Sequence, residues 1–144
     1  MLKLRAWAVS DLDRIGEIEQ SSFSDPWSGQ MLEGAFRSLN FIGFVLEEES
    51  RVVGYIGGGH VLDEGEVFLV AVDSQSRNKG YGKMLVNEFI RSCLDYGVKR
   101  VFLEVRRSNT TAIACYTSCG FIKIAERARY YGDGEDAIIM EKKI

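Results

Sequence analysis

A buried strand, a glycine turn, an amphipathic helix and a second buried strand follow one another between residues 66 and 105. "EVFLVAV" at 66–72 has the apolar, β-branched composition of a strand, and "RVFLEV" at 100–105 has the same character. From Tyr81 to a stop near Gly97, apolar residues recur at helical spacing. A strand–helix–strand unit brings its two strands back parallel through a right-handed crossover. This unit commits the chain to a fold that mixes helices with a sheet.

The remaining segments predict strands that are mostly antiparallel. Segments 41–48 and 51–59 flank the polar pair Glu49-Ser50 and predict a β-hairpin. The other predicted elements, in chain order, are a strand at 3–8, a helix from the capping-box pair Ser10 and Asp13 through Phe23, a helix at 28–38, a short helix capped by Asn109 and ended by Gly120, and two strands around "GDGE" at 132–135. The order β-α-α-β-β-β-α-β-α-β-β predicts one mixed α/β domain over residues 1–144, α+β-like, with a mostly antiparallel central sheet of about seven strands, a β-α-β crossover and four helices.

Charge and composition exclude several classes of protein. The formal net charge is −3, and no cluster of five or more Lys and Arg occurs, so we expect no direct nucleic-acid partner. An acidic surface suits a basic peptide partner better. The longest apolar run, 67–72, is far too short to span a bilayer, and the N-terminus lacks the apolar core of a signal peptide, so we expect a cytoplasmic protein that does not enter a membrane. We expect a monomer or a weak dimer.

Cysteine and histidine are sparse. Cys93, Cys115 and Cys119 form no C-x-x-C motif, so we expect reduced thiols and no disulfide framework. The single histidine, His60, leaves no Cys/His cluster for a transition metal, and we expect no metal site. Cys115 and Cys119 suggest a covalent acyl-thiol intermediate, but neither has a recognisable histidine partner, and structural thiols are the favoured interpretation.

The turn "SRNKGYGKML" at 76–85 carries two glycines at the start of a predicted helix. Glycine allows a close approach of the backbone to a ligand, and the free N–H groups of a helix start favour an anion. Lys83 is followed by Met84 rather than Ser or Thr, which excludes a P-loop, and Leu85 stands where a dinucleotide fingerprint needs a third glycine. The alternative is a glycine-rich loop that only turns the chain.

Three further residues have the chemistry of an active site. Glu104 interrupts an apolar strand and lies by alternation on the face opposite Val101 and Val105, where it suits a general base; the alternative is a solvent-facing carboxylate. Tyr116 suits a general acid for a leaving thiolate, and core packing is the alternative. Asn109 has the pattern of a helix N-cap, which is compatible with a ligand contact.

The pattern R-x-x-G-x-G, formed by Arg77, Gly80 and Gly82 between a strand and a helix, resembles the pyrophosphate arm of the GCN5-related N-acetyltransferases, the GNAT superfamily. "LEVRRSNTTAIACY", the following "GF" and "RARYYGDGEDAIIM", together with "DPWS" at 25–28, resemble the RimI group of ribosomal-protein-alanine N-acetyltransferases. The resemblance covers residues from about 10 to 141, and the second half is the more specific. The chain departs from the pattern at Ser74 and Gly132, where proline is common, and at Cys115, where an aliphatic residue is frequent.

The resemblance implies acetyl-CoA as co-substrate and assigns a role to each matching residue. Glu104 is implied as the proton acceptor and Tyr116 as the proton donor. The implied acetyl-CoA contacts are Val70, Ala71 and Val72 for the pantetheine arm and acetyl carbonyl, Arg77, Asn78, Lys79, Gly80, Tyr81, Gly82 and Lys83 for the diphosphate, and Asn109 for the coenzyme A arm. Arg129, Tyr130 and Tyr131 are implied to frame the N-terminus of the acceptor peptide.

The expected reaction is direct transfer of an acetyl group to the N-terminal α-amine of a protein, most specifically the N-terminal alanine of a small-subunit ribosomal protein. A free α-amine has a pKa of about 8, against about 10.4 for lysine, so a single glutamate neutralises the α-amine more easily. Two alternatives stay open: acetylation of lysine or a small amine on the same scaffold, and a non-catalytic acyl-CoA-binding module.

Overall fold

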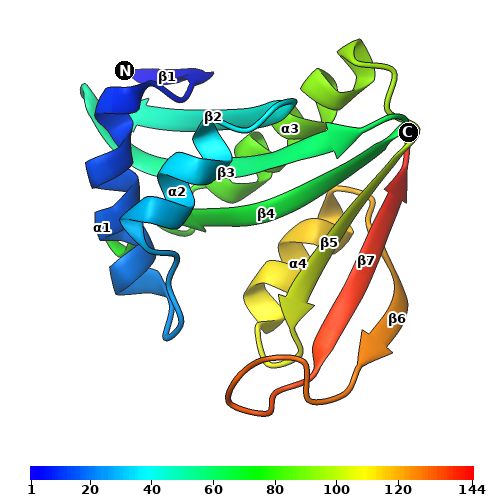
Figure 1. Cartoon of the computed structure of the whole chain (residues 1–144). Coiled ribbons are helices and arrows are strands. Elements are labelled where there is room, and N and C mark those ends of the chain that lie inside the picture. The colour runs from blue at the N-terminus through cyan, green and yellow to red at the C-terminus, as the bar shows by residue number, and fades with distance from the viewer.

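A seven-stranded mixed sheet with the strand order β1-β2-β3-β4-β5-β7-β6 runs through the molecule (Figure 1). The structure is a computed structural model that describes all residues, 1–144. Its strands are β1 (Leu2–Ala6), β2 (Phe41–Glu48), β3 (Arg51–Val61), β4 (Glu64–Val72), β5 (Arg100–Arg106), β6 (Ile122–Arg127) and β7 (Ala137–Lys143). Only β4 and β5 pair in parallel, and every other neighbouring pair is antiparallel. The predicted fold class is confirmed.

Two helices cover each face of the sheet. The helices are α1 (Leu12–Ser22), α2 (Gly29–Phe36), α3 (Tyr81–Asp95) and α4 (Thr110–Ser118), with short 3₁₀ turns at Val9–Asp11 and Ser74–Ser76. Figure 1 shows α1 and α2 in front of the sheet and α3 and α4 behind it. Each layer has its own core: 8 buried residues lie on the α1–α2 side and 20 on the α3–α4 side. No helix combines the length and the apolar character that crossing a membrane requires.

The start of α1 differs from the sequence prediction. The predicted first strand, 3–8, already ends at Ala6, and the Ser10–Asp13 capping box is wrong. Asp11 supplies the capping carboxylate instead: it accepts a hydrogen bond from the backbone N–H of Ala8 at 2.7 Å. The physical reason is tertiary, because the same carboxylate is held in the fold by an arginine.

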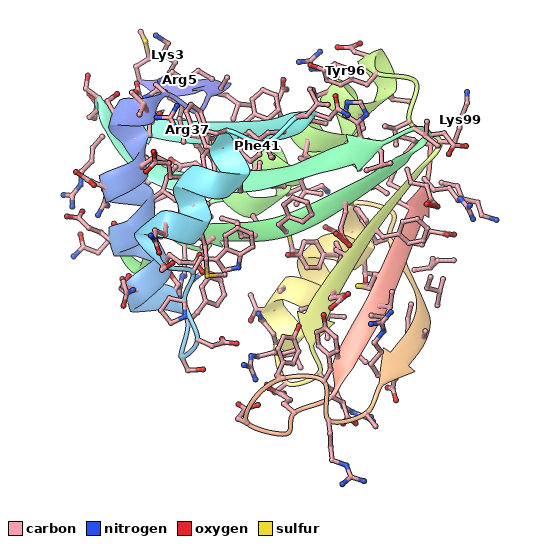
Figure 2. All side chains as sticks on the ribbon, viewed as in Figure 1. Lys3, Arg5, Arg37, Phe41, Tyr96 and Lys99 are labelled. Carbon is pink, nitrogen blue, oxygen red and sulfur yellow. The ribbon has the colours of Figure 1, made fainter.

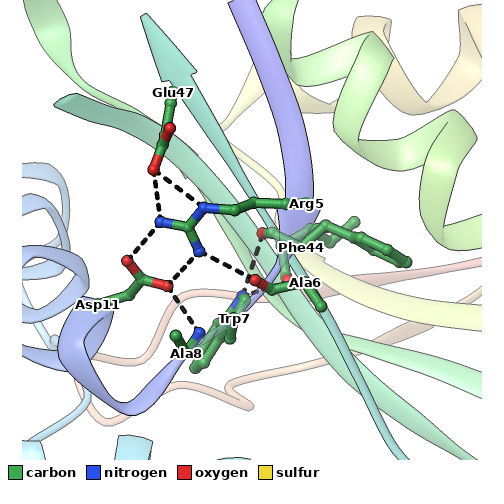
Figure 3. A network of polar contacts seen from close by, with 8 residues as sticks. Arg5, Ala6, Trp7, Ala8, Asp11, Phe44 and Glu47 are labelled. Atoms are coloured by element: carbon green, nitrogen blue, oxygen red, sulfur yellow. Dashed lines mark hydrogen bonds and ion pairs between the residues drawn. The ribbon is translucent and has the colours of Figure 1, made fainter. Parts of the chain in front are cut away.

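That arginine is Arg5 of β1, which joins the 3₁₀ turn before α1 to β2 (Figure 3). Its guanidinium donates to both carboxylate oxygens of Asp11, at 2.7 and 2.9 Å, and to Glu47 at 2.6 Å. Bidentate pairs of this kind are strong and fix the orientation of both partners. The hydrogen bonds from Arg5 lower the pKa of Asp11. Asp11 is thereby kept ionised in the folded state, although its residue is only 5% exposed.

The middle of β4 contains a β-bulge. Gly57 pairs with Leu69 and Gly58 with Val67, so Phe68 has no partner in β3. As a result, Val67 and Leu69 belong to the cores on opposite faces of the sheet. Gly58 is required here, since a Cβ atom at this position would lie 2.1 Å from the carbonyl oxygen of Glu66. A bulge bends its strand and changes the direction of the residues that follow.

Beyond the bulge, β4 and β5 diverge. They pair only from Glu64–Arg100 to Val67–Leu103, and Figure 1 shows the two ribbons starting together beside the C-terminus and spreading apart. Lys99, labelled in Figure 2, closes the narrow end: its N–H donates to the carbonyl of Asp63 at 2.6 Å and its own carbonyl accepts from Ile144 at 2.9 Å. The open end therefore lies at the carboxyl ends of both strands.

Candidate active site

The open end of the β4–β5 pair leaves backbone groups of β4 without a strand partner. Beyond Val67, the N–H and C=O groups that point toward β5 have no ladder to join. Val70, Ala71 and Val72, the predicted pantetheine-binding residues, lie in this segment and are half-buried. An unpaired strand edge can pair with an extended amide-containing ligand.

The glycine turn presents a row of free N–H groups. The amides of Asn78, Lys79 and Gly80 donate to no acceptor in the protein. The next three amides open α3 and have no partner one turn earlier in the helix. Asn78 (φ 63°) and Gly80 (φ 81°) adopt left-handed backbone conformations, and no side chain caps the helix. Convergent amides at a helix start form a cradle for phosphate groups.

The side chains of the turn are held in different ways. Arg77 donates from Nε to the carbonyl of Val72 at 3.1 Å, which ties the turn to the end of β4. Lys79 lies 3.6 Å from a Glu48 carboxylate oxygen, and Tyr81 donates its hydroxyl hydrogen to the same carboxylate. Because the Tyr81 side chain is buried in the core, only its backbone amide is free for a ligand.

Asn109 caps α4, as predicted. Its side-chain oxygen accepts a hydrogen bond from the backbone N–H of Ala112 at 3.1 Å. The cap fixes the start of the helix that carries Tyr116. A contact between Asn109 and coenzyme A stays a prediction.

Glu104 lies on the sheet face covered by α1 and α2. Val101, Leu103 and Val105 are buried on the opposite face, which confirms the predicted alternation along β5. Sequence reasoning missed a second carboxylate, that of Glu66 on β4, which is next to Phe102 in the parallel register. Burial and the charge of Glu104 raise the pKa of Glu66. The two carboxylates therefore lie within electrostatic reach of each other.

The tyrosine pair of the β6–β7 loop lies beside this carboxylate. The nearby Glu104 carboxylate is the main cause of the raised pKa of Tyr130. Burial, followed by the charge of Glu104, raises the pKa of Tyr131 to about 12. The two rings meet edge to face, with centroids 5.2 Å apart. Arg129 has a left-handed backbone (φ 52°), and its guanidinium makes no hydrogen bond or ion pair, so nothing joins its side chain to Glu104.

Tyr116 is buried in the larger core, on the α4 side of the sheet, and its residue is 7% exposed. Its ring packs against Phe121, with centroids 6.0 Å apart. No protein group forms a hydrogen bond with its hydroxyl, so the hydroxyl hydrogen is not engaged within the protein. Burial raises the pKa of Tyr116, which keeps the phenol protonated. Both the core-packing and the proton-donor interpretations are compatible with this position.

Cys93 and Cys115 are poor nucleophiles. Burial raises the pKa of Cys115 to about 11 and that of Cys93 to about 12. His60 lies elsewhere: it stacks on Tyr96 with ring centroids 4.6 Å apart, and neither ring nitrogen has a hydrogen-bond partner. No group of three or more His, Cys, Asp or Glu side chains is arranged to hold a metal ion.

Two segments that sequence reasoning did not assign also border the site. Trp27, from the α1–α2 loop, stacks on Phe68 at the β4 bulge, with centroids 6.3 Å apart. Arg106 of β5 contacts this loop through Asp25 at 2.9 Å. A signal for Arg106 was present in the sequence, because it has the same strand parity as Glu104. The stacking of Trp27 depends on the bulge and had no comparable signal.

Together, these features can bind a diphosphate at the turn, an extended amide chain along β4, and an amine near Glu104. The residues present fit acetyl-CoA, which needs those first two contacts. A carboxylate and a protonated phenol can then remove a proton from an amine and supply one to a leaving thiolate.

Comparison with known proteins finds similarity to acetyltransferases. The profile described as the acetyltransferase (GNAT) family matches residues 12–121. The [ribosomal protein bS18]-alanine N-acetyltransferase of Salmonella typhimurium is 35% identical over 136 residues, covering 92% of this chain and 91% of that protein. A putative enzyme of the same name from Bacillus subtilis is 32% identical over 143 residues, covering 95% and 92%. The crystal structure of the ribosomal-protein-S18-alanine N-acetyltransferase from Escherichia coli superposes with a TM-score of 0.93 at 34% identity, covering 100% of this chain and 94% of that chain.

Proposed function

Since the chain belongs to the acetyltransferase (GNAT) family and is an acetyl-CoA-dependent N-acetyltransferase, we propose that its acceptor is the N-terminal α-amine of a protein. The proposed substrate is the N-terminal alanine of a small-subunit ribosomal protein. The proposal follows the names of the relatives, which are alanine N-acetyltransferases of ribosomal protein bS18. The observation that carries the proposal is the position of Glu104: a carboxylate at the open end of the diverging strands, beside Tyr130 and Tyr131.

The proposed mechanism assigns each residue one task. The free amides from Asn78 to Lys83 hold the diphosphate of acetyl-CoA, and the β4 backbone from Val70 to Val72 holds its pantetheine arm. Glu104 takes a proton from the acceptor ammonium, directly or through water. The amine nitrogen then attacks the acetyl carbonyl carbon, a C–N bond forms and the C–S bond breaks. Tyr116 supplies the proton that the leaving thiolate requires, and the second proton that the nitrogen loses returns to the phenol through solvent.

Charge around the site favours a basic acceptor. Five carboxylates lie near the open end, those of Glu66, Glu104, Asp25, Asp133 and Glu135. Two arginines lie among them: Arg106 pairs with Asp25, Asp133 and Glu135, and Arg127 lies over the ring of Tyr130. This excess of negative charge attracts an α-ammonium group and the Lys and Arg residues that follow it in a ribosomal protein.

The test is acetylation of a basic peptide that starts with alanine and contains an internal lysine. Intact-mass measurement with acetyl-CoA should show the gain of one acetyl group, and the gain should disappear when the N-terminus is blocked. Acetylation of the blocked peptide at lysine would contradict the α-amine assignment. A panel of peptides starting with Ala, Ser, Met and Gly then measures the preference for the first residue.

Glu104→Gln removes the proton acceptor with little change in shape and should lower kcat by about 10²-fold or more. Coenzyme A affinity, measured by calorimetry, should stay at the wild-type value. A Glu104→Gln variant with full kcat would remove the role of Glu104. Wild-type protein that binds coenzyme A and acetylates no amine would favour a non-catalytic acyl-CoA-binding module.

A further inference from the structure

Two loops border the face of the sheet on which Glu104 lies. The α1–α2 loop, residues 23–28, places Trp27 on Phe68 at the β4 bulge. The β6–β7 loop, residues 128–136, places Tyr130 and Tyr131 beside Glu104. These loops come from opposite ends of the chain, and no strand pairing joins them. Their separation, which sets the width of the acceptor opening, must be fixed by side chains.

One side chain contacts both loops. The Arg106 guanidinium donates to Asp25 of the first loop at 2.9 Å, to both oxygens of Asp133 of the second loop at 3.0 and 2.9 Å, and to Glu135 at 3.0 Å. It also lies over the ring of Tyr131, 4.2 Å from the centroid. The planar fork of arginine is suited to several carboxylates at once.

The ion pairs of Arg106 are partly buried and bring several like charges together. The Arg106 side chain is 19% exposed, so its ion pairs are partly shielded from water. Three carboxylates converge on one cation, and they would repel one another if the cation were removed. Loss of Arg106 should therefore move the loops apart rather than leave them in place.

The first loop has a second, independent anchor at its other end. The buried carboxylate of Glu19 on α1 accepts from the backbone N–H of Trp27 at 3.0 Å and also from the hydroxyl of Tyr55. Ser28 then caps α2. The loop is therefore anchored to α1 at Trp27, and the contact between Asp25 and Arg106 connects its tip to the second loop.

We propose that Arg106 is a positioning residue for the acceptor: it joins the α1–α2 loop to the β6–β7 loop and holds the opening over Glu104 at the width of a peptide N-terminus. It acts through Asp25, Tyr131 and the β6–β7 loop and does not touch the reacting atoms. The inference rests on the proposed function, because it concerns binding of the acceptor peptide.

The first experiment measures hydrogen exchange in the free protein and needs no activity. Asp25→Asn should increase exchange in residues 23–28 and leave 128–136 unchanged, since the contacts of Arg106 with Asp133 and Glu135 remain. Arg106→Gln should increase exchange in both loops. Arg91→Gln is the control: this arginine of α3 is 59% exposed and pairs with Glu88 and Asp95 of the same helix, away from both loops. Wild-type exchange in residues 23–28 of Asp25→Asn would overturn the proposal.

The second experiment measures steady-state kinetics. Asp25→Asn and Arg106→Gln should each raise the KM for the acceptor peptide by about tenfold and change the KM for acetyl-CoA by less than about twofold. Arg91→Gln should leave both values unchanged. Equal increases in both KM values, or a wild-type acceptor KM in Asp25→Asn, would overturn the inference.

Asp25→Asn keeps the test decisive if Arg106→Gln fails to fold, because the Asp25 side chain is 57% exposed and its loss leaves no buried charge. If the wild-type protein acetylates no α-amine, the proposed function fails. The exchange pattern still decides in that case whether Arg106 joins the loops.

Discussion

Cys115 of α4 packs against Gly82 in the first turn of α3: a Cβ atom at Gly82 would lie 3.6 Å from the Cys115 Sγ. Tyr116 follows Cys115 directly, so the helix that carries the proposed proton donor touches the helix start that carries the proposed diphosphate cradle. The contact explains how two segments over thirty residues apart keep a fixed relation. The ordinary van der Waals distance also leaves room for a small side chain at Gly82.

Gly82→Asp should weaken coenzyme A binding without lowering the free energy of unfolding. An aspartate in the first turn stabilises a helix by about 0.3–1 kcal/mol, so the free energy of unfolding should be unchanged or slightly higher. The same carboxylate would repel the diphosphate and should weaken coenzyme A binding by about tenfold or more. Denaturant unfolding and calorimetry measure the two quantities. Gly29→Asp in the first turn of α2 is the control and should bind coenzyme A normally; equal binding by Gly82→Asp would contradict the cradle.

Cys115→Ala should retain kcat within about twofold, because a thiol whose pKa is raised to about 11 holds little thiolate near neutral pH. Rate measurement should be combined with intact-mass analysis of the wild-type protein incubated with acetyl-CoA alone. No acetyl adduct on Cys115 is expected. A stable adduct at this residue, together with a large loss of rate in the variant, would establish a covalent intermediate instead.

Tyr116→Phe should lower kcat by about 10²-fold or more and leave the KM for acetyl-CoA near the wild-type value. Burial raises the pKa of Tyr116, so increasing pH removes its proton only well above the ordinary tyrosine value of about 10. The wild-type kcat should therefore show no decline caused by this phenol between about pH 7 and pH 10. Two results together would refute the role of Tyr116 as the acid. The kcat of Tyr116→Phe would equal the wild-type value at neutral pH, and kcat would fall with rising pH in this range in both proteins.

Asp11→Asn should destabilise the protein near neutral pH by about 1–3 kcal/mol, since Arg5 loses its bidentate partner and Ala8 loses its acceptor. The pKa of Asp11 is lowered in the folded state, so its contribution is present above the unfolded value of about 4 and is lost as the pH falls below it. The difference between variant and wild type should therefore shrink in urea unfolding at about pH 3. Asp13→Asn, at an exposed position of α1, is the control; a constant difference at all pH values would argue against an ionic role.

The sequence by itself determined the order of helices and strands, because these depend on local periodicity and on caps such as Asn109 and the turn at Gly80. It also assigned Glu104 to the face opposite Val101 and Val105, since alternation along a strand is a local property. These features need only residues that are close in the chain.

Tertiary structure alone decided the features that give the site its shape. The bulge at Phe68 arises from pairing with Gly57 and Gly58, and it breaks the regular alternation of faces along β4, which the continuous apolar run at 67–72 does not indicate. Arg106 meets Asp25 across 81 residues of sequence. Such contacts form only when loop closure and packing of the whole sheet bring distant segments together, and no local pattern encodes their distances.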